Sequence, residues 1–440
     1  MVNSPPLNPG ASDWLQTLVR SPNEAPVAST GSPGGSIGLG RVRAARALLS
    51  TRLADLGLLY GTPLLGAAWA PDLAPPERLF LAVHLGLVAL GHALADAMGR
   101  PRARRELDLA IAFLAFSGEH RAAAALARQP APEASSIDRA LAKAARVLAR
   151  RKEPLVADPV YGVPLHNGLN YIDARAFGRI ALAYFAEDRL DANTAARRLA
   201  HARRNKAVLL DALVQLAWAN GPPSPTARRA VLRQISGLGL DRATARALRE
   251  ILERPPGPQD LAQRVHGREL RQFVLAQAIL ASLVDGAHSS SERRFLAELA
   301  GAFSVSPLEV RQLELALAAF YAEHRDMVDT FTASEAGREL ADELIDDLSH
   351  TLEKNLTAVA QELRQTGELA ELLTKSARGA PLSADERARL KQNLVDVAKA
   401  VPSLALLAAP GGLLLLGALT RVLPFNILPS AWEKPRKREP

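Results

Sequence analysis

Apolar residues recur along most of the chain at the spacing of one face of an α-helix. The pattern is clear in residues 44–59, 76–98, 106–127 and 136–152, and it resumes near Asp173 and continues with breaks to Gln365. Runs of β-branched residues in strict alternation, which mark half-buried strands, are missing from the sequence. The pattern therefore predicts an all-α fold built of multi-helix bundles.

Residues 79–94 are nearly uncharged, so they could be mistaken for a membrane span. His84 and His92 interrupt the stretch, and it is shorter than the roughly 20 residues that cross a bilayer as a helix. We therefore interpret it as a buried core helix.

The first 40 residues are rich in Pro, Gly, Ser and Asn. They lack the basic-then-apolar order of a signal peptide. We expect a disordered leader over residues 1–40, with no signal peptide and with the chain beginning in the cytoplasm.

An internal repeat aligns residues 209–251 with residues 274–316 without a gap. Asn220-Gly221 falls on Asp285-Gly286, and Ser224 falls on Ser289. A repeat of this length predicts one helical unit that is used twice. The second copy and the residues after it carry the capping-box pattern that starts helices, at Ser289/Glu292, Ser306/Glu309, Thr332/Glu335 and Ser383/Glu386.

Residues 401–432 form a hydrophobic segment near the C-terminus, with no charged residue before Arg421. An unbroken helix of about 20 residues would cross about 30 Å of hydrocarbon. Pro410-Gly411-Gly412 interrupts the segment, since proline removes a hydrogen bond and glycine loosens the backbone. We expect a re-entrant hairpin or a kinked span in the membrane, and the alternative is a buried hairpin that closes a soluble bundle.

Basic residues flank this segment on both sides. Lys391 and Lys399 precede it, and a basic tail follows it with Lys434, Arg436, Lys437 and Arg438. A hairpin keeps both flanks on the cytoplasmic side, as the positive-inside rule requires, and the tail would gain from anionic headgroups. The flanks thus predict membrane lipids as partners, at the cytoplasmic face of the inner membrane.

The net charge of +8 suits an anionic partner such as phospholipid headgroups or RNA, although 46 acidic residues among 54 basic ones fit simple solubility equally well. The lack of cysteine excludes thiol catalysis and cysteine-ligated metals. Neither a HExxH pair nor a phosphate-binding glycine loop is found, so we expect no enzyme, no cofactor and no DNA binding.

A basic stretch without aromatic neighbours is interpreted as a solvated helix face; it holds Arg197, Arg198, Arg203, Arg204 and Lys206.

The second copy of the repeat resembles the tellurite-resistance B-like (TerB-like) helical module, and the resemblance covers residues 205–320. An apolar helix ends in Asp285-Gly286, and Glu292 opens the next helix after a polar turn. Some members of that family bind a divalent cation through such acidic residues, so the resemblance implies Asp285 and Glu292 as metal ligands. The alternative is structural, because Glu292 also completes the capping box of Ser289 and two carboxylates are few for a hard cation.

The last 60 residues resemble the membrane segment of the leucine-zipper, EF-hand-containing transmembrane (Letm-like) family, most closely its bacterial relatives. The family's intramembrane Glu is replaced by Leu413, and a second proline is replaced by Gly417, which puts its cation/proton exchange in doubt. Its ribosome-binding part lies beyond the Leu-Pro-Ser ending. The residues that carry the resemblance include Asp396, Pro402, Pro410, Gly411, Gly412, Pro424, Pro429, Ser430 and Trp432.

The predicted organisation after the leader begins with an N-terminal helical domain, at 41–152. The degenerate and the complete TerB-like units follow at 165–260 and 261–330, a long connecting helix at 331–380, and the membrane segment with its basic tail at 381–440. This order predicts a membrane-associated helical interaction protein in envelope or ion homeostasis or stress response. The alternatives are a soluble scaffold that binds the ribosome, RNA or a protein, and a component of cation/proton transport.

Overall fold

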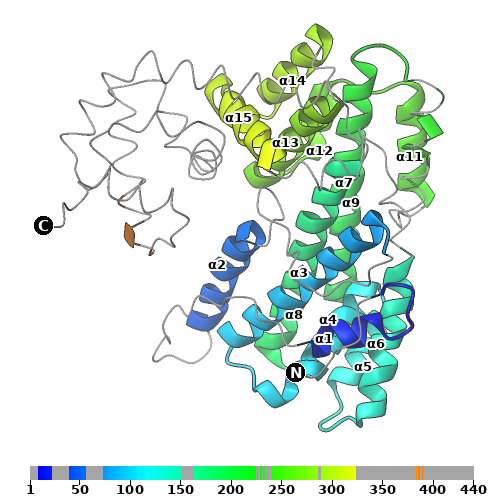
Figure 1. The fold of residues 1–440 in the computed structure, drawn as a ribbon, viewed down its shortest axis with the longest axis vertical. Coiled ribbons are helices and arrows are strands. Elements are labelled where there is room, and N and C mark those ends of the chain that lie inside the picture. Colours follow the sequence, from blue (N-terminus) through cyan, green and yellow to red (C-terminus); the bar gives the residue numbers. More distant parts are fainter. Residues whose placement is uncertain are drawn as a thin grey trace, which may run out of the picture. The chain divides into compact units, whose positions relative to one another are not determined.

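The computed structural model describes residues 8–21, 39–55, 73–150, 162–223, 242–285 and 289–323, with 225, 228–229, 231–232, 235, 240, 383, 385–386 and 389. Every regular element in these residues is a helix, as the sequence predicts, and no strand occurs among them (Figure 1). The chain divides into two compact units, at Met1–Gln277 with Thr330–Thr332 and at Ala278–Asp329 with Ala333–Pro440. The predicted hydrophobic segment at 401–432 and the connecting helix at 331–380 lie outside the described residues.

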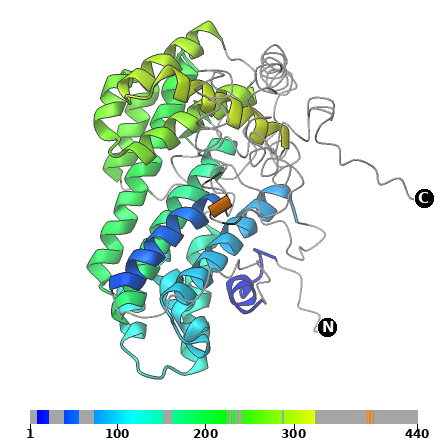
Figure 2. The same ribbon diagram turned by 90° about the vertical axis from the view of Figure 1, so that its left-hand side faces the viewer.

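The core of the first unit is built around α4 (Arg105–Ser117), which packs against α3 (Pro75–Ala97), α6 (Ala134–Ala149) and α8 (Ala174–Glu187). α2 (Leu39–Asp55) packs on α3 and α8 (Figure 2). Phe113 and Phe116 of α4 contact Phe177 of α8, with ring centroids 4.8 Å and 5.8 Å apart. These rings are buried and lie where the two helices meet.

α3 is the buried helix that the uncharged stretch predicts. Residues 77–97 are apolar and long enough to cross a membrane, but 78% of their most apolar window is buried within the protein. His84, which interrupts the stretch, is buried and bonds through Nδ1 to the carbonyl oxygen of Phe80 at 2.8 Å. The packing thus gives α3 a protein environment in the described part of the chain.

The predicted disordered leader contains a packed helix, α1 (Trp14–Arg20), so the prediction is wrong for these residues. Trp14 is 2% exposed, and its ring lies 5.2 Å from Phe80 and 5.0 Å from His84 of α3. Trp14, Leu15 and Leu18 give α1 an apolar face, which is why a short helix between polar segments packs on the core.

The apolar spacing of residues 106–127 predicts one helix, but the structure has two. Gly118 adopts a left-handed conformation with φ of 109° and ends α4, and α5 (His120–Ala127) follows. Glycine tolerates this conformation without a steric penalty, so it stops a helix whose apolar pattern continues.

Helical structure also resumes earlier than the predicted Asp173. α7 (Gly162–Gly168) continues through the π-helical turn η3 (Leu169–Asp173) into α8. The 27-residue α9 (Ala192–Trp218) follows, and the carboxylate of Asp191 caps it by accepting hydrogen bonds from the backbone N–H groups of Asn193 and Thr194.

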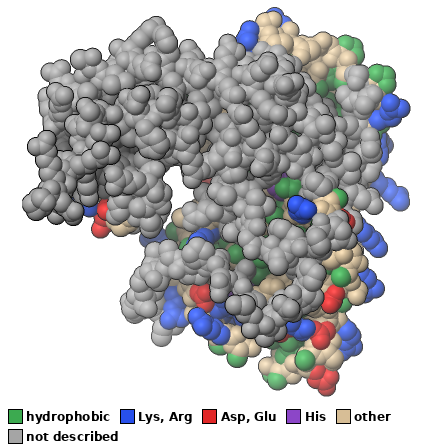
Figure 3. All heavy atoms as spheres, viewed as in Figure 1, with side chains coloured by type: hydrophobic (Ala, Val, Ile, Leu, Met, Phe, Trp, Pro, Cys, Tyr) green, Lys and Arg blue, Asp and Glu red, His purple; other side chains and the backbone are tan. Residues whose placement is uncertain are grey.

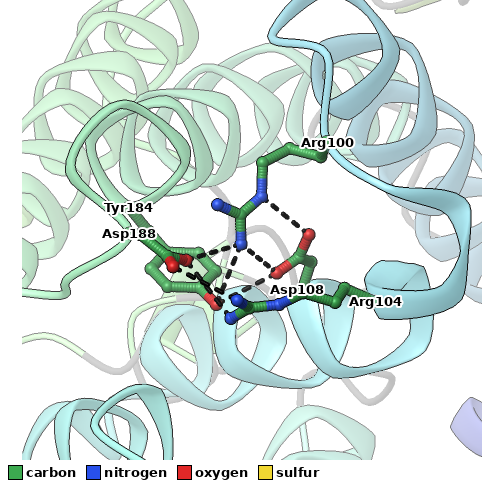
Figure 4. A network of polar contacts seen from close by, with 5 residues as sticks. All are labelled: Arg100, Arg104, Asp108, Tyr184 and Asp188. Atoms are coloured by element: carbon green, nitrogen blue, oxygen red, sulfur yellow. Dashed lines mark hydrogen bonds and ion pairs between the residues drawn. The ribbon is translucent and has the colours of Figure 1, made fainter. Parts of the chain in front are cut away.

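A polar network joins α8 to α4 and the turn before it (Figure 4). Arg100 donates to both carboxylate oxygens of Asp108, at 2.9 Å and 2.7 Å, and pairs with Asp188 at 2.7 Å. Asp108 is fully buried and also accepts a 3.0 Å hydrogen bond from the hydroxyl of Tyr184. Arg104, just after α3 in η1 (Arg102–Arg104), adds a second, more exposed pair to Asp188.

The predicted repeat can be compared with the helices after α9. The first unit continues with α11 (Arg242–Glu253), α12 (Pro258–Arg264) and most of α13 (Arg268–Asp285). The second unit contains α14 (Ser290–Ala302) and α15 (Pro307–Glu323). α11 and α15 begin at positions that the repeat aligns, but the duplication itself stays a prediction.

The capping boxes are confirmed at three of the four predicted places. Glu292 donates its N–H to the hydroxyl of Ser289 at 3.1 Å, and its carboxylate accepts from the N–H of Ser289 at 3.0 Å. The same reciprocal bonds join Ser306 with Glu309 and Ser383 with Glu386. The fourth predicted box, at Thr332, lies outside the described residues.

Candidate functional site

A cavity of about 290 Å³ lies between the start of α8 and the first half of α9, and its lining is strongly basic. η3 and α8 supply one wall and α9 supplies the other, and the charged side chains come from α8 and α9. We call it the arginine cavity, and its cationic side chains are Arg175, Arg179, Arg197 and Arg198. His201 also lines it, and burial together with the neighbouring arginines lowers the pKa of this histidine.

Helical spacing explains why these side chains converge. Arg175 and Arg179 are four residues apart in the sequence and therefore share one face of α8. Arg198 and His201 share a face of α9 for the same reason. Because η3, α8 and α9 pack against one another, the two faces meet at the cavity.

The arginines of the cavity repel one another. The pKa of Arg179 is lowered from its ordinary value, first by burial and then by the charges of Arg175 and Arg198. Burial also lowers the pKa of Arg198, and the charges of Arg46 and Arg197 add to the effect. A negative charge placed between these groups would offset the repulsion that contributes to both shifts.

Few protein groups compensate this charge. Arg175 pairs with Glu269 at 3.0 Å, and Arg197 donates to the hydroxyl of Thr194 at 2.8 Å. Within the described residues, Arg179 and Arg198 make no ion pair, and the buried Nε of Arg198 has no hydrogen-bond partner. The arrangement thus offers guanidinium donors to a ligand.

The basic stretch of α9 is only partly the solvated face that the sequence predicts. Arg203 and Arg204 are exposed, but Lys206 is buried and its ammonium nitrogen lies 2.6 Å from a carboxylate oxygen of Asp173. The prediction is therefore wrong for Lys206, because the helix turns this position toward η3. On the face drawn in Figure 3, exposed Lys and Arg side chains are also spread over the described surface, together with fewer acidic ones.

A second cavity, of about 440 Å³, adjoins the arginine cavity, and His201 and Asn205 line both. We call it the aliphatic cavity, because its walls from α9, α11 and the start of α13 are mainly apolar. Trp218 helps to hold α11 against α9 through a 3.2 Å hydrogen bond to the carbonyl oxygen of Leu252. Its apolar lining residues are Ala207, Val208, Ala247, Leu248, Ile251 and Leu270.

Polar groups stand at the edge of the aliphatic cavity. Arg264, from α12, forms an ion pair with the fully buried Asp211 of α9, which also accepts a 2.9 Å hydrogen bond from Gln215. Burial raises the pKa of Asp211, and Arg264 opposes that effect. This pair attaches α12 to α9 and so fixes one side of the cavity.

The predicted metal ligands are described only in part. The backbone of Asp285 ends α13, but its side chain lies outside the described residues. Glu292 is 3% exposed, and besides capping α14 it accepts a 3.3 Å hydrogen bond from the hydroxyl of Ser282. No cluster of three or more His, Cys, Asp or Glu suited to a metal occurs among the described residues, and metal binding by Asp285 and Glu292 stays a prediction.

The remaining predicted site residues, in the membrane segment and the basic tail, all lie outside the described part of the chain. Conversely, the sequence pattern predicts neither cavity. The repeated spacing of Arg175 and Arg179 was an available signal, but only the packing of α8 on α9 brings them to Arg198.

Comparison with known proteins gives two partial likenesses. Residues 164–317 match the family described as "Protein of unknown function (DUF533)", a range that includes most of the TerB-like resemblance and both cavities. A stretch of 70 residues is 41% identical to the LETM1 domain-containing protein YLH47, mitochondrial, of Saccharomyces cerevisiae. That match spans 16% of this chain and 15% of the yeast protein. No solved structure matches the chain. The chain is therefore similar to known proteins only over these limited segments of its all-α fold.

Proposed function

We propose that this protein is a non-enzymatic, membrane-associated helical protein whose body binds an anionic group in the arginine cavity. The observation that carries the anion-binding part is the convergence of Arg179 and Arg198, which lack ion-pair partners in the described residues. Membrane association is supported by the hydrophobic segment at 401–432, which basic residues flank, and by the 70-residue similarity to a LETM1 domain-containing protein.

Arginine suits this role because its planar guanidinium donates two parallel hydrogen bonds to the oxygens of a phosphate or carboxylate. Such charge-assisted bonds strengthen in a partly desolvated site. The cavity of about 290 Å³ has room for one such group together with water. A phosphate-type anion is therefore the ligand that we expect.

Calorimetric titration of the full chain with inorganic phosphate tests anion binding. We expect measurable binding that Arg179→Gln/Arg198→Gln removes. The matched control is Arg203→Gln, an exposed position on the same helix that lies outside the cavity, which should bind as the wild type does. Equal binding by the double variant and the control would refute the proposal.

Flotation of the full chain with vesicles tests the membrane part. We expect flotation on vesicles of phosphatidylglycerol and phosphatidylcholine, and we expect Leu414→Glu/Leu415→Glu in the hydrophobic segment to abolish it. Protein that stays at the bottom of the gradient without the substitutions would favour the soluble scaffold instead. Three further hypotheses need their own assays. A role in envelope or ion homeostasis is tested by phenotype, ribosome binding by co-sedimentation with ribosomes, and cation transport by ion flux.

A further inference from the structure

We infer that the anion is the head group of a single-chain amphiphile, whose hydrocarbon tail occupies the aliphatic cavity. This inference rests on the proposed anion binding and adds the class of ligand. It starts from the adjacency of the two cavities, since His201 and Asn205 line both. A ligand with its charge between Arg179 and Arg198 would pass these two residues to place its remaining part in the second cavity.

The lining of the aliphatic cavity favours a hydrocarbon chain over a nucleotide base. Its apolar walls are made of Ala, Val, Leu and Ile, and among the described residues no Phe, Tyr or Trp lines it. Proteins that bind bases commonly stack them on aromatic rings, whereas aliphatic side chains gain from covering methylene groups. The volume of about 440 Å³ is within the range of small-molecule sites.

The charges along the path fit the same orientation. Four arginines line the arginine cavity, whereas Arg204 and Arg264 line the aliphatic cavity, and Arg264 is already paired with Asp211. Within the described part of the chain, neither Asp nor Glu lines the two cavities. The head of an anionic amphiphile is therefore attracted to one end, and its tail is left for the other.

A series of alkyl phosphates tests the inference, each titrated into the full chain below its critical micelle concentration. From butyl to octyl phosphate we expect affinity to rise by roughly four-fold for each methylene group that is fully buried. Affinity should level off once the cavity is filled. An affinity independent of chain length would overturn the inference, and so would tighter binding of adenosine monophosphate than of octyl phosphate.

Ala247→Trp separates this inference from the proposed function. Ala247 is exposed on α11 and lines the aliphatic cavity, so the indole should block the tail and remove the dependence on chain length. Ala243→Trp is the matched control, because Ala243 is exposed on the same helix but does not line the cavity. Inorganic phosphate should bind equally to both variants.

The outcomes are distinct. If inorganic phosphate binds through Arg179 and Arg198 but chain length has no effect, only the amphiphile is refuted. If neither inorganic nor alkyl phosphates bind, both the anion-binding proposal and the amphiphile inference are refuted. Flotation with phosphatidic acid vesicles distinguishes the source of the head group. If Ala247→Trp lowers the floated fraction and Ala243→Trp does not, the ligand is a bilayer lipid and the inference of a free single-chain ligand is overturned.

Discussion

Lys206 and Asp173 form a buried ion pair, with 2.6 Å between the ammonium nitrogen and a carboxylate oxygen, and both side chains are less than a tenth exposed. The pair joins α9 to η3 directly beside the arginine cavity. Removing one partner takes a close counterion away from the other, buried charge, which is costly. The pair therefore fixes how α9 and η3 meet.

We predict that Lys206→Met lowers the free energy of unfolding by about 3 kcal/mol, because Asp173 loses its buried counterion. Denaturant unfolding monitored by circular dichroism measures this change. Lys143→Met is the control, since that lysine makes an exposed pair with Glu119 and should cost less than about 1 kcal/mol. Equal losses in the two variants would contradict a special role for the buried pair.

Tyr184→Phe should lower the free energy of unfolding by about 2 kcal/mol. The substitution removes the hydroxyl that donates a 3.0 Å hydrogen bond to the buried carboxylate of Asp108, while it keeps the ring that Arg100 covers. Arg104→Gln, which breaks the more exposed pair with Asp188, should cost less than about 1 kcal/mol. Thermal or denaturant unfolding of both variants decides the order, and a reversed order would refute it.

Acid should weaken the protein through His166. Burial lowers the pKa of this side chain to about 4. Its contribution to stability is complete above the unfolded pKa of about 6.5, and it falls as the pH drops toward 4, because only the unfolded chain takes up the proton there. The loss approaches about 3 kcal/mol at pH 4.

His166→Asn is expected to remove this pH-dependent part, at a cost in stability that does not vary with pH. Unfolding free energies measured between pH 4.5 and 7.5 give the slope for each protein. A variant with the wild-type slope over that range would show that other groups cause the acid sensitivity.

Arg198→Gln should stabilise the ligand-free protein by a few tenths of a kcal/mol, because it relieves repulsion with Arg46, Arg197 and Arg179. The same change should reduce the stabilisation that added phosphate gives the wild type. Melting temperatures with phosphate and with chloride at equal ionic strength measure both effects. A loss of stability without phosphate would contradict the repulsion between these arginines.

Local sequence patterns predict much of the fold, but they do not predict the arginine cavity. Helical spacing predicts the all-α architecture, and the Ser-x-x-Glu order at Ser289 and Ser306 predicts where α14 and α15 begin. The same spacing cannot detect the stop at Gly118 or the packing of Trp14, because these depend on one backbone conformation and on a distant helix. The arginine cavity escapes prediction for the second reason, since its walls come from segments that meet only after folding.

The π-helical turn η3 has a consequence for comparing relatives of this chain. A turn that is one residue wider than an α-helical turn shifts the following helix by about 100° around its axis. The direction of Arg175 and Arg179 is therefore set by the residue count in Leu169–Asp173, upstream of the arginines themselves. A homologue that keeps both arginines but lacks one residue here would point them elsewhere, so the number of residues in this turn is a better marker for sorting such homologues than arginine identity.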